Sequence, residues 1–208
     1  MSFTRINRAT EPTEPVATLT LIAGFERSQG LRLPSLDELV GAIRVQRVKA
    51  RESALLQGED CRDVFVVRHG LFKQSFVAAD GRERIKSFAA EGSLFACPTA
   101  LAGRGPAGFS SVAIEPGVVE RVPFPVLEDL AERSVAWQKA LRLAFQWLSE
   151  RKVQRERELL SCTPVQRWLL LQAEAPHWLA RVSQKDLAAY LGVTAVGLNR
   201  IIHRPATP

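Results

Sequence analysis

Residues 182–203 constrain the fold more than any other stretch of this chain, because they predict two short helices joined by a tight turn. Leu187, Ala188 and Leu191 recur at helical spacing and predict one apolar stripe. Gly192 follows that stripe, and glycine adopts positive φ at low cost, so the first helix is expected to end there. The second helix has its own apolar stripe, which consists of Leu198, Ile201 and Ile202.

Polar residues stand where each of these helices should begin. Ser183 is expected to cap the first helix, with Asp186 three residues on, and Thr194 is expected to cap the second. Ala188 is small at a point where two steeply crossed helices would approach closely. This combination predicts a helix-turn-helix, whose second helix lies in the major groove of DNA. The alternative is an ordinary pair of antiparallel helices inside a helical domain.

The positive charge of the chain is concentrated in its last quarter. The net charge is +6 overall. Residues 151–208 carry 9 Lys and Arg against 4 Asp and Glu, whereas the first 150 residues carry 19 against 18. A basic segment beside a neutral remainder is typical of a surface that faces phosphates. A solvated basic face would explain the charge alone, but not the charge together with the helix pair.

The composition is that of a globular protein, with 46% hydrophobic and 24% charged residues in a chain of 208. No apolar run reaches the roughly 18 residues of a membrane helix, and no secretory signal opens the chain. We therefore expect a cytoplasmic protein. Cys61, Cys97 and Cys162 are widely spaced, which favours free thiols over a disulfide framework or a zinc or iron–sulfur site.

Short β runs punctuated by glycine occupy the chain from residue 44 to about residue 125. Six to eight strands at this spacing predict a small roll or sandwich, with a hairpin turn at Asp80-Gly81. Residues 1–16 are expected to form a loose arm, and Ser35 is expected to cap a short helix that runs to Ile43. The predicted strands include residues 64–68, 71–77, 82–89, 110–114 and 118–122.

Residues 134–160 contain neither Gly nor Pro and predict one long helix. Four apolar residues along it follow a 4-3-4 spacing, which is typical of a coiled-coil seam and predicts pairing with the same helix of a second copy. An amphipathic helix lying on its own domain is the alternative. A capping-box sequence, Thr163-Pro164-x-Gln166, then begins a new helix. The seam residues are Trp137, Leu141, Ala144 and Leu148.

Several segments together resemble the Crp/Fnr family of bacterial transcription regulators. They are residues 58–60, 64–70, 80–83, 111–116, 160–171, 183–194 and 198–201, and the resemblance covers roughly residues 35–204. It implies an α+β fold in four parts. These are an N-terminal arm (1–34), an effector-sensing β roll like a cyclic-nucleotide-binding jelly roll (35–133), a dimerisation helix (134–160) and a helix-turn-helix DNA-binding domain (161–208).

The sequence departs from the members of that family that bind cyclic nucleotides. Those members hold the ribose and the cyclic phosphate through a Gly-Glu-Leu segment and a later Arg-Ser or Arg-Thr pair. Residues 95–98 read Phe-Ala-Cys-Pro at the first place, and residues 107–110 read Ala-Gly-Phe-Ser around the second. We therefore predict that cyclic AMP is not the ligand, because a buried phosphate would lack a charged partner.

The resemblance also implies a small-molecule effector inside the roll, of unknown identity. Some family members sense gases through heme, so a Cys97 thiolate on a heme is an alternative to an inert buried thiol, which we favour. The residues expected near the effector are Ala96, Cys97, Arg104, Phe109 and Ser110.

The expected partners are double-stranded DNA, a second copy of the chain and, by the resemblance, RNA polymerase. Arg200 has fork donors suited to guanine or to a phosphate, and the family's motif places a DNA-contacting arginine there. Ala195 and Val196 offer only apolar contact, for example to a thymine methyl group. The residues expected to contact DNA are Gln184, Thr194, Ala195, Val196, Asn199, Arg200 and His203.

Two other classes of function are alternatives. A small β roll can be a metal-dependent cupin enzyme, but that requires clustered ligands, and His69, His177 and His203 stand far apart. We therefore expect no enzymatic activity, no catalytic residues and no metal. A ligand-sensing or protein-interaction module that does not read DNA has the same fold. Since the chain ends at Pro208, no β wing is expected after the helix pair.

Overall fold

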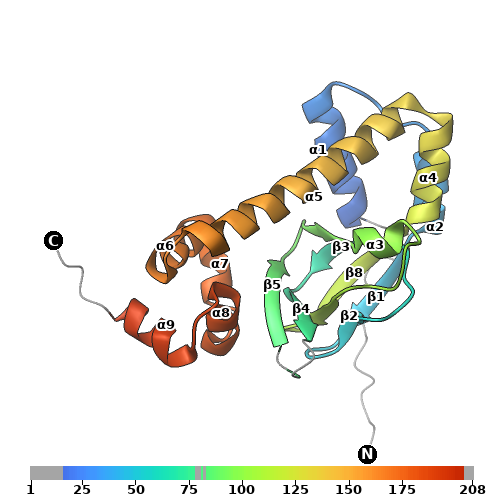
Figure 1. Ribbon diagram of the computed structural model, residues 1–208. Helices are drawn as coiled ribbons and strands as arrows, with labels where there is room; N and C mark the ends of the chain where they lie inside the picture. The colour runs from blue at the N-terminus through green and yellow to red at the C-terminus, as the bar shows by residue number, and fades with distance from the viewer. Residues whose placement is uncertain (1–15, 78–80, 82, 204–208) are drawn as a thin grey trace, which may run out of the picture.

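The computed structural model describes residues 16–77, 81 and 83–203. Two lobes are joined by one long helix (Figure 1). The larger lobe is a β roll, and the smaller lobe is a cluster of short helices that ends near the C-terminus. None of the described helices is long and apolar enough to cross a membrane.

Two four-stranded antiparallel sheets form the roll, which confirms the predicted architecture of six to eight strands. Their strand orders are β1-β8-β3-β6 and β2-β7-β4-β5. β4 and β5 pair as the predicted hairpin, although Asp80 in its turn lies outside the described residues. The strands are β1 (Arg44–Val48), β2 (Ser53–Leu55), β3 (Asp63–His69), β4 (Phe72–Val77), β5 (Glu83–Ala89), β6 (Leu94–Phe95), β7 (Ser110–Ala113) and β8 (Gly117–Pro123).

Aromatic side chains fill the space between the two sheets. Phe65 and Phe95 stack with ring centroids 4.8 Å apart, and Phe72 packs on Phe95. The turn between β3 and β4 requires glycine at Gly70, whose φ is 94° and where a Cβ would lie 2.8 Å from the Cα of Gly117. The roll is therefore closed tightly at this end.

The N-terminal helix α1 (Val16–Gln29) lies within the segment 1–34, for which the sequence predicted no helix, and it packs against the roll. Glu120 of β8, completely buried, accepts hydrogen bonds from the backbone N–H groups of Ala17 (2.9 Å) and Thr18 (2.7 Å). This carboxylate caps the first turn of α1 from a distance of about one hundred residues in sequence. Residues 1–15 lie outside the described part of the chain.

Replacing Glu120 by alanine is expected to lower the free energy of unfolding by about 2–6 kcal/mol. Each buried N–H that loses its acceptor costs about 1–3 kcal/mol, and this change leaves two. Urea denaturation measures the loss, and hydrogen exchange should show faster exchange confined to α1. Glu132→Ala, which changes an exposed glutamate of helix α4 (Phe124–Arg133), is the matched control. Equal stability of the two variants would show that α1 is held by apolar packing alone.

The predicted capping of the short helix before the roll by the Ser35 side chain is wrong. Helix α2 (Leu36–Ala42) follows Ser35, but the backbone of Ser35 is left-handed, with φ 57°, and its side chain makes no capping hydrogen bond. Two further helices follow in the large lobe, the single-turn α3 (Pro98–Leu101) and α4 (Phe124–Arg133).

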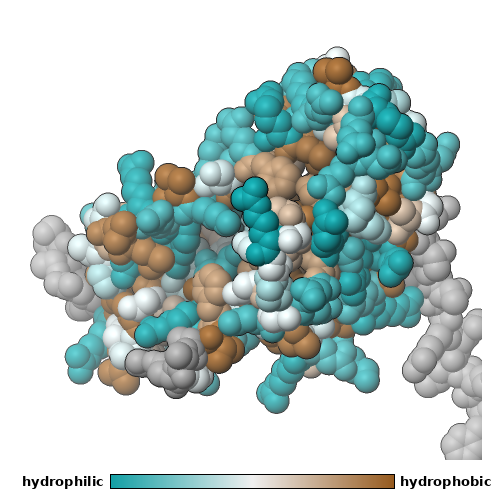
Figure 2. Space-filling model, turned by 45° about the vertical axis from the view of Figure 1, so that its right-hand side comes forward, coloured by the Kyte–Doolittle hydropathy of each residue, from teal (hydrophilic) through white to brown (hydrophobic). Residues whose placement is uncertain are grey.

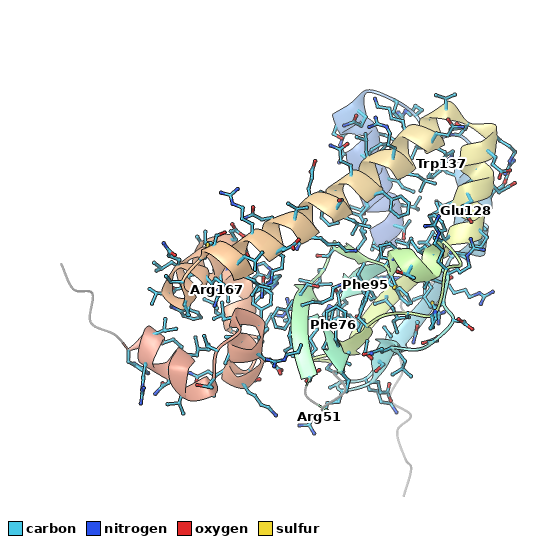
Figure 3. All side chains as sticks on the ribbon, in the orientation of Figure 1. Arg51, Phe76, Phe95, Glu128, Trp137 and Arg167 are labelled. Atoms are coloured by element: carbon cyan, nitrogen blue, oxygen red, sulfur yellow. The ribbon has the colours of Figure 1, made fainter. Side chains whose placement is uncertain are left out.

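The long helix α5 (Val135–Ser161) agrees with the predicted extent of 134–160. Its first seam residue, Trp137, is only 3% exposed and donates its indole N–H to the carbonyl of Pro34 at 2.8 Å. Trp137 near the roll end of α5 is labelled in Figure 3. Because this residue is buried in its own chain, it is not available to a partner helix. At this end α5 lies on its own domain.

The smaller lobe contains the helices α6 (Pro164–Glu174), α7 (Pro176–Leu179), α8 (Gln184–Leu191) and α9 (Ala195–Ile202). The capping box at Thr163 is confirmed, because Thr163 and Gln166 exchange side-chain and backbone hydrogen bonds. One apolar cluster continues from the roll into this lobe and joins Leu71, Ile85 and Phe88 to the inner faces of α8 and α9. The two lobes therefore share a core.

Candidate nucleic-acid interface and interlobe cavity

The helix pair α8–α9 has the geometry that its sequence predicts. Ser183 accepts a hydrogen bond from the backbone of Asp186 (3.1 Å), and Thr194 accepts one from Gly197 (3.0 Å). Gly192 ends α8 in the left-handed conformation, with φ 70°. The apolar stripes of both helices face inward, because Leu187, Ala188, Leu191 and Leu198 are all buried.

The outer surface of this pair holds all the residues expected to contact DNA. Arg200 lies on the exposed side of α9 and forms no ion pair with any described residue. Val196, 64% exposed, lies on the same helix. Figure 2 shows apolar side chains at the surface of this lobe among hydrophilic ones. The exposed residues are Gln184, Thr194, Ala195, Val196, Asn199, Arg200 and His203.

Two arginines fix this helix pair to the long helix, and the sequence analysis missed both roles. Arg167 of α6 donates to the carbonyls of Leu191 (3.0 Å) and Cys162 (2.7 Å), so it joins the ends of α8 and α5. Figure 3 shows it at this junction. Arg155 of α5 donates to the carbonyl of Tyr190, and its guanidinium lies 3.8 Å from the Tyr190 ring centroid. Both cations lie at the negative end of the α8 dipole.

Ion pairs also hold the smaller lobe against the roll. Arg181, which follows α7, makes a two-pronged contact with Glu91 at 2.8 and 2.9 Å and also pairs with Glu115. Lys73 of β4 lies 3.5 Å from Asp186 of α8. Phe88, Trp178 and Tyr190 form a cluster of three rings across the same boundary. The roll therefore sets the orientation of the helix-turn-helix.

The contacts of the Glu91 carboxylate make the stability of the protein depend on pH. The hydrogen bond from Arg181 is the main cause that lowers the pKa of Glu91 to about 2, with further help from the backbone N–H of Gly70. An unfolded chain has a glutamate pKa of about 4.3. Because the pKa of Glu91 is lower in the folded protein, the ionised carboxylate stabilises the fold. This stabilisation is complete above the pKa of the unfolded chain and is lost as the pH falls through the pKa of the folded protein.

We expect Glu91→Gln to destabilise the protein by a constant amount at neutral pH, and by less as the pH falls from about 4.3 towards 2. Urea denaturation of both proteins at several pH values measures this difference. Glu132→Gln, at an exposed site, should show no such trend. A difference for Glu91→Gln that stays constant down to pH 2 would contradict the role of the ionised carboxylate.

A cavity of about 1200 Å³, here called the interlobe cavity, lies between β5, the C-terminal half of α5 and the smaller lobe. The effector was predicted inside the roll, but buried side chains such as Phe65, Phe72 and Phe95 fill that space. Three of the residues expected near it, Ala96, Cys97 and Phe109, line the interlobe cavity instead. The other two do not. Arg104 is exposed in the loop after α3, and the Ser110 hydroxyl accepts a hydrogen bond from the backbone of Gln57 at 3.0 Å.

The two segments at which family members hold a cyclic nucleotide offer no matching groups to the interlobe cavity. From residues 95–98 only Phe, Ala, Cys and Pro side chains border it, so this segment offers no carboxylate to a ribose. From residues 107–110 only Gly108 and Phe109 border it, and neither can pair with a phosphate. Cys97 is a buried thiol that accepts a hydrogen bond from the backbone of Gly108 at 3.3 Å. Within the described ranges, no three His, Cys, Asp or Glu cluster as a metal site.

A second, smaller cavity of about 580 Å³ is lined mainly by apolar side chains of α1, α5 and the roll. The remaining seam residues border this apolar cavity, and each is partly exposed. Phe145, 37% exposed, packs edge-on against Phe124 beside them. The rest of the chain therefore buries these seam residues of α5 only in part. These seam residues are Leu141, Ala144 and Leu148.

The chain thus has the architecture of a two-lobed protein in which a long helix joins a β roll to a C-terminal helix-turn-helix, with a cavity between the lobes. Residues 45–134 match the family described as the cyclic nucleotide-binding domain. The chain is 24% identical over 187 residues to regulatory protein HlyX of Actinobacillus pleuropneumoniae, covering 83% of this chain and 75% of that protein. The chain is therefore similar to Crp/Fnr-type regulators, which confirms the resemblance seen in its sequence.

Solved structures share the fold. FixK2 from Bradyrhizobium japonicum superposes with a TM-score of 0.66 at 23% identity, covering 77% of this chain and 82% of that one. A transcriptional regulator of the Crp/Fnr family from Eubacterium rectale also gives 0.66, at 11% identity, with coverage of 84% and 83%. The α+β fold with its β roll and C-terminal helix-turn-helix is therefore confirmed.

Proposed function

We propose that this chain is a sequence-specific DNA-binding transcription regulator that acts as a homodimer and responds to a small molecule in the interlobe cavity. RNA polymerase is a further partner that the resemblance implies. Homology to Crp/Fnr-type regulators supports the general class. The observation that carries the proposal is the exposed outer side of α9, where Asn199, Arg200 and His203 are accessible to a groove of DNA.

The architecture offers a physical route from cavity to DNA. β5 contributes Lys86 and Ser87 to the interlobe cavity, while Ile85 and Phe88 of the same strand pack in the cluster shared with α8. Tyr190 of α8 lines the same cavity. A ligand that binds one orientation of the smaller lobe better than another would therefore shift the orientation of α9, and with it the affinity for DNA.

Pairing of α5 with the α5 helix of a second copy would place two α8–α9 helix pairs on one DNA duplex. Leu141, Ala144 and Leu148 are the seam residues that support this part of the proposal, because the chain itself leaves them partly exposed. A two-fold dimer contacts two half-sites about one helical turn, or roughly 34 Å, apart. The operator is therefore expected to be a symmetric pair of half-sites.

Selection from a library of randomised duplexes tests the proposal. We expect enrichment of a two-fold symmetric site, and an affinity for it that falls linearly with the logarithm of salt concentration, because bound phosphates release counterions. Binding that ignores salt, or a selection that enriches nothing, would contradict DNA reading. That result would favour the alternative, a ligand-sensing or protein-interaction module of the same fold.

A further inference from the structure

Lys86 is a cation in the wall of the interlobe cavity without an acidic partner. Its Nζ lies 3.7 Å from the ring centroid of Phe109 and 5.9 Å from that of Phe76. No Asp or Glu among the described residues forms an ion pair with it. The two rings stabilise the ammonium through their faces, but they cannot neutralise its charge. A partly buried ammonium in this position is stabilised when an anion enters the cavity.

The opposite wall adds positive charge. Arg151 and Lys152 of α5 both line the cavity, and the Arg151 guanidinium lies 5.0 Å from the Trp147 ring centroid. Repulsion from Lys152, after the larger effect of burial, lowers the pKa of Lys86 to about 8. Cations from two separate elements thus face one space.

The carboxylates around the cavity do not neutralise Lys86. Glu91 pairs with Arg181, and Glu158 pairs with Arg155 at 3.4 Å. Glu150 accepts a hydrogen bond from Gln146 at 2.9 Å. The two other lining carboxylates, Glu156 and Glu174, are exposed to solvent. None of the described carboxylates that line the cavity therefore forms an ion pair with Lys86.

We propose that the interlobe cavity binds a small anion with an aromatic or apolar body, whose carboxylate, sulfonate or phosphate group meets Lys86. Phe76, Phe109 and Trp147 border the cavity and make part of its wall apolar. Here the cation comes from β5 and not from residues 107–110, and the site needs no ribose. The proposal rests on the proposed function only in treating this ligand as the effector.

A pair of dyes of similar shape tests the charge requirement. The anionic dye is 8-anilinonaphthalene-1-sulfonate, and the neutral one is N-phenyl-1-naphthylamine; binding of each is followed by its fluorescence. We expect the full chain to bind the sulfonate about tenfold more tightly than the amine, because a charge-assisted contact is added. Equal affinities would overturn the proposal, as would binding of the sulfonate only in the apolar cavity.

Substitution locates the site. Lys86→Met should remove the preference for the sulfonate and leave the affinity for the amine unchanged, whereas Lys139→Met, a lysine of α5 outside the cavity, should change neither. If Lys86→Met does not fold, Lys86→Gln replaces it, and the dye pair on the unaltered protein still decides. A preference that survives the loss of Lys86 overturns the assignment.

The pH dependence gives an independent readout. The sulfonate affinity should fall as the pH rises through about 8, because Lys86 then loses its proton. Lys152 of α5 and the Cys97 thiol before α3 act on it electrostatically. The other charged or titratable side chains that line the cavity are Glu91, Glu150, Arg151, Arg155, Glu156, Glu158, Arg167, Glu174, His177 and Tyr190. The dye measurements need no DNA. Loss of the dye preference with intact operator binding overturns only this inference, and failed selection with intact dye preference overturns only the proposed function.

Discussion

Replacing Arg200 by alanine is expected to weaken binding to the selected operator by about 5- to 150-fold, which corresponds to about 1–3 kcal/mol. The guanidinium is exposed on α9 and forms no ion pair within the described chain, so removing it costs the free protein little. Its fork geometry suits guanine O6 and N7, and the loss should therefore be greater for the operator than for random DNA.

Gel shift with both duplexes measures this difference. Arg27→Ala, which removes the same charge from the exposed face of α1, is the matched control and should leave operator affinity within twofold. If Arg200→Ala weakens operator and random DNA equally, Arg200 contacts a phosphate and not a base. If it weakens neither, α9 is not the recognition helix.

The helix pair α8–α9 could be predicted from the sequence because its caps and its turn depend on local interactions. The caps at Ser183 and Thr194 join residues three positions apart, and the turn at Gly192 depends on one residue. Apolar spacing then determines which face is buried. The strands of the roll were predictable for the same reason, since β runs and glycine turns are short-range signals.

Long-range contacts explain what the sequence could not predict. The first turn of α1 is capped by Glu120, which lies about one hundred residues further along the chain. The residues around Val16 therefore give no sign of this interaction. Arg167 lies in a segment that resembles the family, residues 160–171, yet its partner Leu191 lies 24 residues further on. Trp137 fits a seam by spacing, but a carbonyl at Pro34 takes its indole N–H. Spacing gives the face of a helix, not what covers that face.

The lobe contacts and the interlobe cavity belong to one arrangement. Arg181 binds carboxylates of the roll, while Arg155 and Arg167 bind the carbonyl end of α8. Each contact fixes α8, and so α9, relative to the cavity wall. On the proposed function, a small ligand-dependent change at β5 or α5 would reorient α9, because packed elements move as units.

Leu148→Glu is expected to split the proposed dimer and to lower operator affinity by about 100-fold or more. In a two-fold pair of α5 helices the change places two unpaired carboxylates in the seam, where burial of charge is costly. A single α8–α9 helix pair then binds one half-site without the gain in affinity from linking two binding units, which is typically 10²- to 10⁴-fold. Light scattering during gel filtration should show a shift from dimer to monomer.

The matched control is Leu169→Glu, which makes the same change at a residue of α6 that is 57% exposed and lies outside the seam. It should remain dimeric and bind the operator normally. Thermal unfolding of each variant separates lost pairing from lost folding, and Ala144→Glu serves if Leu148→Glu unfolds. A folded Leu148→Glu protein that is still dimeric and binds the operator normally would mean that α5 only covers its own roll. Dimer contacts would then have to come from another surface, and the spacing of half-sites would no longer be set by this helix.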